Sequence, residues 1–376
     1  MSLYLLICLT GLMQQKPVQA VTPQQNQGSQ IPKISTSRAQ LNGPVYNDPN
    51  YQPQKSGHTL FTECLDAIKK KWLPMTYQSA KAVELDVDLK LNVKPPRETG
   101  LTDYMEFEVQ LDGVALPNER YNLKVTGDVG NMELIRSQTR KLMIYHSGKG
   151  FADQTLPRGK HSNIDSYRSY ALRHLGVLSD QILKNGGYRL KYLGSGNYKG
   201  QLIDRISISK IVKRKRNRKG PIPMSHLWTF WQSGKYEVWI FQGSKFPAAV
   251  FYSNPEDHIY ANFTIDYNEQ LLPELFVLQN NSSGFEGHTE IRFDFDENRL
   301  LELVSFRFHT SEGHQMSFDA RLNFLKEVED GLISGIPPFG YQKMNQDHLK
   351  ILVMAQMAGN LLNLRQHGLK LKNFKF

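Results

Sequence analysis

Residues 83–94 read VELDVDLKLNVK, and apolar and polar side chains alternate at every position of this stretch. Successive side chains of a β-strand point to opposite faces, so the valines and leucines share one face and the charged residues share the other. The pattern is typical of a strand with one buried and one solvated face. Pro95-Pro96 ends it, because proline has no amide hydrogen for a strand ladder. The stretch therefore predicts a sheet protein.

Similar segments recur as far as Phe324, and short polar turns separate nearly all of them. Such a series favours an antiparallel meander in which neighbours in sequence are neighbours in the sheet. A sheet of so many strands has to curl or split to avoid a long flat edge. The further strands are expected at Met105–Leu111, Tyr121–Thr126, Met132–Arg136, Lys141–His146, Tyr188–Leu193, Gln201–Val212, His226–Gln232, Tyr236–Gln242, Pro247–Tyr252, His258–Tyr267, His288–Asp296, Leu300–His309 and Met316–Phe324.

Three segments have helical periodicity instead. In Thr59–Leu73, apolar residues recur every three or four positions, and three lysines fall in the last turn, where cations interact favourably with the helix dipole. Asp165–Lys184 begins with capping residues and is followed by Gly186-Gly187, which ends it. Asn345–Arg365 is the third expected helix.

The N-terminus resembles a secretory signal peptide over residues 1–20. Leu3–Met13 is an apolar run too short to span a bilayer, and Val18-Gln19-Ala20 is a small-x-small cleavage site. No Lys or Arg precedes the run, so either the true start lies upstream or the segment is not a signal. On the signal interpretation the protein is periplasmic or secreted.

The rest of the chain divides by composition. Residues 21–57 are rich in Gln, Pro, Asn and Ser and predict a disordered tether, because they offer little apolar surface to bury. Residues 58–330 show no clean linker and predict one curved antiparallel β domain with helices. Residues 331–376 predict a helical C-terminal appendix.

Charge and motifs limit the function classes. The 376-residue chain carries a formal charge of +10, which favours anionic partners. Gly194-Ser195-Gly196 lacks the five-residue frame of a nucleophile elbow, and no paired metal-binding histidine motif occurs. We therefore expect a non-enzyme without cofactor or metal. Because paired carboxylates need to meet only in space, a hydrolase that acts on glycan or lipid remains an alternative.

The second half of the chain carries strands that are apolar on both faces. Such a strand is either sandwiched in a core or has one face on a cavity. Several adjacent strands share this property while helices are few, which favours a cavity. The expected ligand-binding residues are Trp228, Phe230, Trp231, Trp239, Phe241 and Phe251.

A basic run follows the strand expected at Gln201–Val212 and precedes Gly220-Pro221, so it is expected to be a hairpin loop. It is either a solvated loop or a contact for an anionic membrane surface, where each basic residue contributes about 1 kcal/mol. Export argues against nucleic acid as the polyanion. The expected contact residues are Lys213, Arg214, Lys215, Arg216, Arg218 and Lys219.

The order of these elements resembles a known superfamily. Residues 122–156, then YRLKYLGSGNYKGQLIDRISISK at 188–210, YEVWIFQGSKFPAAVFYS at 236–253 and FDFDENRLLELVSFRF at 293–308 follow a helix and an alternating strand. This order is similar to that of periplasmic lipoprotein-carrier-like proteins, which include the carrier, its outer-membrane receptor and an envelope-stress regulator. The family's tryptophan-containing strand end is replaced by Met143-Ile144-Tyr145-His146, and its cavity arginine has no counterpart here.

The resemblance implies an α+β fold, a strongly curved antiparallel half-barrel with helices packed on its concave face. It also implies a periplasmic, non-catalytic carrier or binding protein for a lipoprotein acyl chain or another apolar ligand. A cell-envelope sensor or protein-interaction module is the alternative. The expected partners are an acyl chain or lipoprotein and peripherally an anionic membrane, with no nucleic acid, and the chain is expected to be a monomer.

Overall fold

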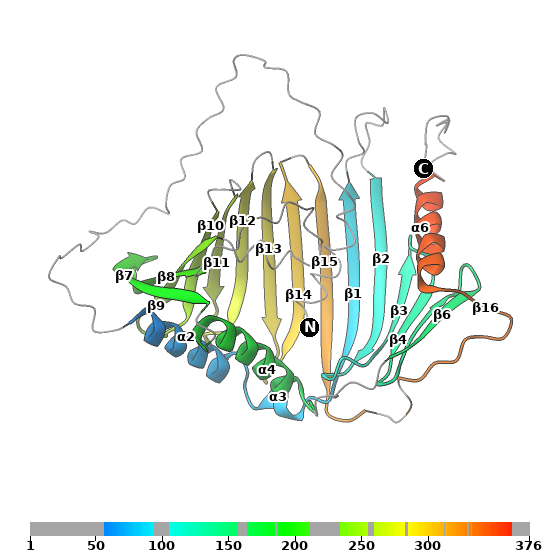
Figure 1. Ribbon diagram of the computed structural model, residues 1–376, viewed down its shortest axis with the longest axis horizontal. Helices are drawn as coiled ribbons and strands as arrows, with labels where there is room; N and C mark the ends of the chain where they lie inside the picture. The colour runs from blue at the N-terminus through cyan, green and yellow to red at the C-terminus, as the bar shows by residue number, and fades with distance from the viewer. Residues whose placement is uncertain are drawn as a thin grey trace, which may run out of the picture.

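The structure is a computed structural model. It describes residues 56–93, 105–156, 164–184, 187–210, 234–254, 259–282, 285–311, 313–328, 331 and 333–362. Sixteen strands of the described chain form one open sheet (Figure 1). They are β1 (Ala82–Val93), β2 (Met105–Ala115), β3 (Tyr121–Gly127), β4 (Met132–Arg136), β5 (Arg140–Tyr145), β6 (Gly150–Thr155), β7 (Tyr188–Tyr198), β8 (Gln201–Lys210), β9 (Lys235–Phe241), β10 (Pro247–Asn254), β11 (Ile259–Tyr267), β12 (Pro273–Ser282), β13 (Phe285–Phe295), β14 (Leu301–Thr310), β15 (Gln315–Leu325) and β16 (Gln342–Lys343).

The chain enters the sheet in its middle. The strand order is β16-β6-β5-β4-β3-β2-β1-β15-β14-β13-β12-β11-β10-β9-β8-β7. From β1 the chain meanders outward to β6, crosses to the opposite edge at β7, and meanders back until β15 lies beside β1. Every pairing is antiparallel except that of β16 with β6. The closing pair sets Val83 opposite Phe324 and Leu89 opposite Phe318, which joins two distant parts of the sequence.

The helices are α2 (Gly57–Lys71), α3 (Thr76–Ser79), α4 (Tyr167–Ser179) with the π-helix Asp180–Lys184, and α6 (Gln346–Leu362). The Ser56 side chain caps α2 by accepting a hydrogen bond from the Thr59 amide at 3.1 Å. The structure confirms all three helices expected from the periodicity. Within the described residues, no helix has the length and apolar character needed to cross a bilayer.

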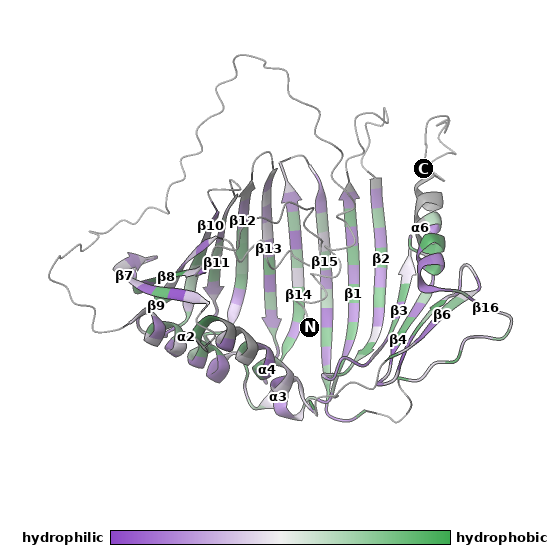
Figure 2. Cartoon of the chain, in the orientation of Figure 1, coloured by the Kyte–Doolittle hydropathy of each residue, from purple (hydrophilic) through white to green (hydrophobic). Residues whose placement is uncertain are grey.

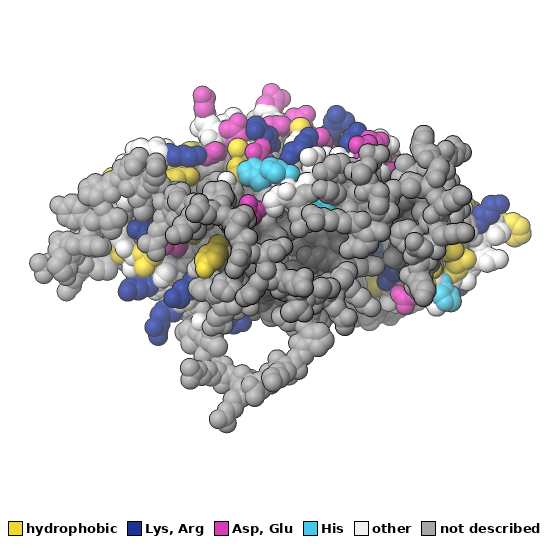
Figure 3. Space-filling view, turned by 90° about the horizontal axis from the view of Figure 1, so that it is seen from above, with side chains coloured by type: hydrophobic (Ala, Val, Ile, Leu, Met, Phe, Trp, Pro, Cys, Tyr) yellow, Lys and Arg dark blue, Asp and Glu magenta, His cyan; other side chains and the backbone are white. Residues whose placement is uncertain are grey.

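Strand pairing defines two faces of the sheet, because residues directly opposite in an antiparallel pair point the same way. Val83 and Leu85 of β1 lie on what we call the helix face, and Glu84 and Asp86 lie on the outer face. Figure 2 shows this alternation as bands of opposite hydropathy along β1, β14 and β15. Charged side chains of both signs gather along one long side of the molecule (Figure 3), and ion pairs of the outer face include Lys90–Glu108, Arg307–Asp319 and Arg321–Asp86.

All three long helices pack on the helix face. Leu60 of α2 packs with Ile206 of β8, Tyr167 of α4 packs with the cluster of Val83, and Leu349 of α6 packs with Met132 of β4. The structure thus confirms an open, largely antiparallel sheet with few helices. That the helix face is the concave one remains a prediction.

Three strands, β6, β12 and the two-residue β16, have no counterpart among the expected segments. In β12 the apolar residues Leu275–Leu278 form a run without alternation, and polar residues follow them, so the period of two is lost. Pro273 stands at the first position of the strand, where proline is tolerated. The short β6 contains glycine and aspartate, which have low strand propensity. The strand expected at His226–Gln232, the leader and residues 21–55 of the tether lie outside the described residues, whereas the last two tether residues, Ser56 and Gly57, cap and begin α2.

A candidate apolar ligand site on the helix face

The central strands present a continuous apolar surface on the helix face. We call it the apolar floor, and its strands are β13, β14, β15, β1 and β2. Phe306 of β14 and Phe318 of β15 lie at its centre, are 3% and 4% exposed, and stack with ring centroids 4.9 Å apart. Its members are Leu89, Leu91, Leu111, Ile291, Phe293, Phe306, Phe308, Met316 and Phe318.

One end of the apolar floor is closed by α3 and α4. The Tyr77 hydroxyl accepts a hydrogen bond from the Leu301 amide at 2.8 Å, and the Tyr167 hydroxyl donates one to the Ala115 carbonyl at 2.7 Å. Both rings meet Phe324 edge-on, with centroids 5.2 and 5.3 Å away. Burial raises the pKa of Tyr77 to about 12 and raises that of Tyr167 as well. These tyrosines are therefore neutral anchors that hold the short helices against the strand ends.

Trp72, which follows α2, forms a second boundary. Its ring lies 6.0 Å from Phe246 and Tyr267 and 6.4 Å from Phe276, measured between centroids. Phe276 in turn meets Phe293 of the apolar floor at 4.7 Å. The aromatic side chains thus run without interruption from α2 to the centre of the sheet.

The third boundary is α6. Leu349 is fully buried against Val125, Met132, Tyr145 and Ala152 of β3–β6. In Figure 1 the described helices lie along the lower end of the sheet and beside β3, and none of them crosses the upper half of β13–β15 and β1. The described helices therefore pack at the margins of the apolar floor, and its central residues Phe306 and Phe318 are buried.

Three of the six predicted ligand-binding residues come together, but on the outer face. Trp239 and Phe251 lie 4.5 Å apart between centroids, and Phe241 joins them through Tyr198. Trp239 is only 3% exposed, its indole N–H donates to Glu237 at 2.8 Å, and the Arg205 guanidinium lies 6.0 Å from its ring. Ligand binding by this cluster remains a prediction.

Both faces of strand β9 are apolar because each face packs in a different hydrophobic cluster. Val238 and Ile240 face α2 and pack with Leu60 and Cys64, whereas Trp239 belongs to the outer-face cluster. Burial raises the pKa of the Cys64 thiol to about 12, so the thiol is protonated and unreactive at neutral pH. The predicted residues Trp228, Phe230 and Trp231, and the basic run Lys213, Arg214, Lys215, Arg216, Arg218 and Lys219, lie outside the described residues.

The apolar floor was missed by the sequence analysis as a site. Its signal was present in the alternation of β1, β13, β14 and β15, which shows that each strand has one apolar face. Only the register aligns these faces on one side of the sheet, and only the helix positions show which part of that side they cover.

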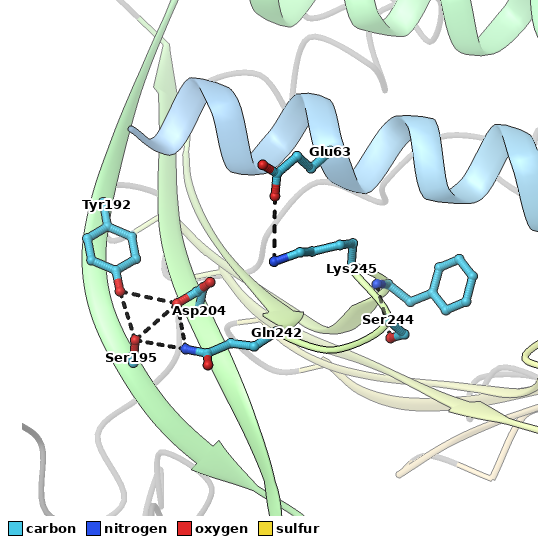
Figure 4. A network of polar contacts seen from close by, with 8 residues as sticks. Glu63, Tyr192, Ser195, Asp204, Gln242, Ser244 and Lys245 are labelled. Atoms are coloured by element: carbon cyan, nitrogen blue, oxygen red, sulfur yellow. Dashed lines mark hydrogen bonds and ion pairs between the residues drawn. The ribbon is translucent and has the colours of Figure 1, made fainter. Parts of the chain in front are cut away.

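A closed polar network lies at the β7–β9 end of the helix face (Figure 4). Asp204, 7% exposed, accepts hydrogen bonds from Tyr192 at 3.2 Å, Ser195 at 3.0 Å and Gln242 at 2.9 Å. Two of these bonds join β7 to β8, the third joins the turn after β9 to β8, and no histidine takes part in the bonds drawn. Ser195 therefore serves as a structural tie here, in a strand whose register shifts between Tyr192 and Gly194.

Lys245 extends this region toward α2, where its ammonium lies 3.6 Å from the Glu63 carboxylate (Figure 4). Among the described residues, no three His, Cys, Asp or Glu side chains gather closely enough to hold a metal ion.

No protein-family model and no curated protein sequence matches this chain. Similar solved structures include a LolA superfamily protein from Nitrosomonas europaea, at 10% identity and TM-score 0.25, covering 73% of this chain and 97% of the other. A DUF1329 family protein from Desulfovibrio piger matches at 8% identity and TM-score 0.28, over 74% and 95% of the two chains. The Pseudomonas aeruginosa MucA/MucB complex matches at 7% identity and TM-score 0.17, over 71% and 94%.

A LolA superfamily protein and MucB thus both appear among the structures similar to this chain. At TM-scores this low, the likeness assigns neither a shared architecture nor a function to this chain.

Proposed function

We propose that the protein is a non-catalytic binding or carrier protein of the periplasm that holds an acyl chain, free or attached to a lipoprotein, on the apolar floor. The observation that carries the proposal is the apolar floor itself, a run of aligned aliphatic and aromatic side chains bounded by α2, α3, α4 and α6. An acyl chain offers only apolar contacts, and the apolar floor offers the matching surface.

The chemistry of the floor supports an apolar ligand over a polar one. Its members carry no hydrogen-bonding side chain, and the tyrosines at its closed end use their hydroxyls on backbone groups of the protein. A polar ligand would lose its bonds to water there without replacement. A saturated chain loses none and gains about 0.8 kcal/mol for each methylene buried.

Solvent extraction of the purified protein followed by mass spectrometry tests for a bound acyl chain. Titration of the extracted protein with a fluorescent fatty acid then measures affinity. Ile291→Asn, on β13 directly opposite Phe306, should weaken binding about tenfold or more, because it replaces an apolar contact with an amide.

Leu202→Asn is the matched control, since Leu202 is 61% exposed in the β7–β8 hairpin, away from the floor. Thermal melts of both variants establish that they are folded. Equal affinity of Ile291→Asn and the unchanged protein would contradict the proposal, as would a wild-type protein that takes up no fatty acid.

The second candidate is an envelope protein-interaction module. The observation in its favour is β7, the outermost strand at its end of the described sheet, whose outer backbone groups suit pairing with a strand of a partner. Hydrogen exchange would show new protection along β7 when such a partner binds, with the fatty-acid affinity of the floor unchanged.

A further inference from the structure

The segment before β16 carries two large apolar side chains in open solvent. Ile336 is 87% exposed and Phe339 is fully exposed. Both belong to the sequence Gly335-Ile336-Pro337-Pro338-Phe339-Gly340, which we call the apolar tip. Large apolar side chains exposed within a few residues of each other indicate an interaction surface when nothing in the fold requires them there.

The base of the apolar tip is firmly attached to the sheet. The Arg140 guanidinium donates a hydrogen bond to the Gly335 carbonyl at 3.1 Å, and a Cβ at Gly335 would lie 2.0 Å from the Ile135 side chain. Ile333 and Tyr341, on either side of the tip, pack on the buried residues Ile135, Leu142 and Ile144 of the outer face.

Its C-terminal side is equally well fixed. The Gln342 amide donates to the Lys149 carbonyl at 2.9 Å, and the Met344 amide donates to the Phe151 carbonyl at 2.8 Å. The Tyr341 hydroxyl and the His146 imidazole are 3.0 Å apart. Two prolines within the tip further restrict its backbone. The tip is thus a projection held in one conformation by its base. Its insertion into a binding partner therefore costs little conformational entropy.

Two exposed lysines lie beside this base, next to acidic residues that already have partners. Asp153 is engaged by Arg140 at 2.8 Å, and Glu133 lies 3.3 Å from His146. Lys149, in the turn before β6, and Lys343, in β16, are both exposed, and neither forms an ion pair within 4.0 Å among the described residues. Figure 3 shows hydrophobic side chains beside Lys or Arg at the end of the molecule where Figure 1 places β16.

We propose that the apolar tip inserts Ile336 and Phe339 into an anionic lipid bilayer while Lys149 and Lys343 contact the headgroups. A projecting apolar tip beside basic residues fits the headgroup–acyl boundary, where the apolar side chains enter and the ammonium groups stay at the surface. The net charge of +10 adds attraction to the same surface. The proposal stands independently of ligand binding on the apolar floor.

Vesicle co-sedimentation of the full chain tests this. We expect binding to phosphatidylcholine vesicles that contain phosphatidylglycerol and a drop of about tenfold or more in the partition coefficient for Ile336→Ser/Phe339→Ser. Both side chains are exposed, so this variant should melt at the wild-type temperature. Leu202→Ser, another exposed apolar residue at the opposite side of the sheet, is the matched control and should bind as the wild type does.

Two further measurements separate the electrostatic contribution of the lysines from the insertion of the apolar side chains. Lys149→Gln/Lys343→Gln should weaken binding to the anionic vesicles and leave the weak binding to pure phosphatidylcholine unchanged. In Phe339→Trp, indole fluorescence should shift to the blue and be quenched by brominated lipid. Wild-type partitioning of Ile336→Ser/Phe339→Ser, or an indole of Phe339→Trp that stays in water on anionic vesicles, would overturn the proposal and favour a protein groove as the partner of the tip.

Discussion

The stacked pair Phe306–Phe318 should be energetically coupled, and a double-mutant cycle with leucine measures that coupling. The two rings are almost parallel, with 9° between their planes and 4.9 Å between their centroids, and both are nearly completely buried. They lie directly opposite each other on β14 and β15. An aromatic pair of this geometry contributes about 0.5–1.5 kcal/mol beyond the apolar area that it buries.

The expected values follow from that geometry. Each single Phe→Leu change removes part of a buried ring and the whole stacking term, for a loss of about 2 kcal/mol of unfolding free energy. The double variant loses the stacking term once, so it should lose about 3 kcal/mol, less than the sum of the two singles. Urea denaturation followed by circular dichroism gives the four free energies.

Leu349→Ala combined with Phe306→Leu is the control cycle, because Leu349 packs in the separate cluster under α6. That pair should be additive within about 0.5 kcal/mol. A coupling between Phe306 and Phe318 no larger than the control coupling would refute the reasoning and show that the stack contributes only buried area.

Three further predictions concern the elements around the apolar floor. Leu349→Ala should cost about 2–5 kcal/mol of unfolding free energy in urea melts, since a fully buried leucine leaves a cavity between α6 and the sheet, and a smaller loss would show that α6 collapses into it. Ser56→Ala should cost about 1 kcal/mol, because it removes the side chain that caps α2, and Ser56→Asp should restore the cap; equal stability of all three proteins would contradict this. The hydrogen bond from Arg140 lowers the pKa of Asp153, so the stability that this pair contributes is present above the carboxyl's ordinary pKa and is lost as the pH falls through the lowered value. Asp153→Asn should therefore flatten the acid side of the curve of unfolding free energy against pH. An unchanged acid slope would exclude the pair as a contributor.

The positions of strands were predictable wherever one face of the strand is exposed to solvent. In β1 the polar residues between Val83 and Val93 reveal the period directly. In β12 both faces carry apolar residues over Leu275–Leu278, so the period disappears although the strand is present. The α2 helix was predictable because its stripe is regular and its cap is local, whereas strand pairing depends on contacts that are distant in sequence.

The candidate site was less predictable for the same reason. Aromatic abundance indicated Trp239 and Phe251, and the structure does bring them together. Composition does not show which residues of β9 face α2. In the structure Trp239 lies on the outer face of the sheet, which is the face away from the helices. The apolar floor needs the register of five strands before its residues become one surface.

The order of strands has a consequence for how the floor forms. Leu89 on β1 lies opposite Phe318 on β15, and this pairing joins the first strand of the sheet to the last strand of the returning meander. Before that pairing forms, the floor exists as two separate halves, one on β1 and β2 and the other on β13–β15. A ligand that spans both halves binds the closed sheet far better than either half, so it stabilises the β1–β15 junction by mass action. Such a ligand should therefore raise the protection of the β1 and β15 amides against hydrogen exchange more than that of β7 and β8, and this difference separates binding on the floor from adsorption elsewhere on the molecule.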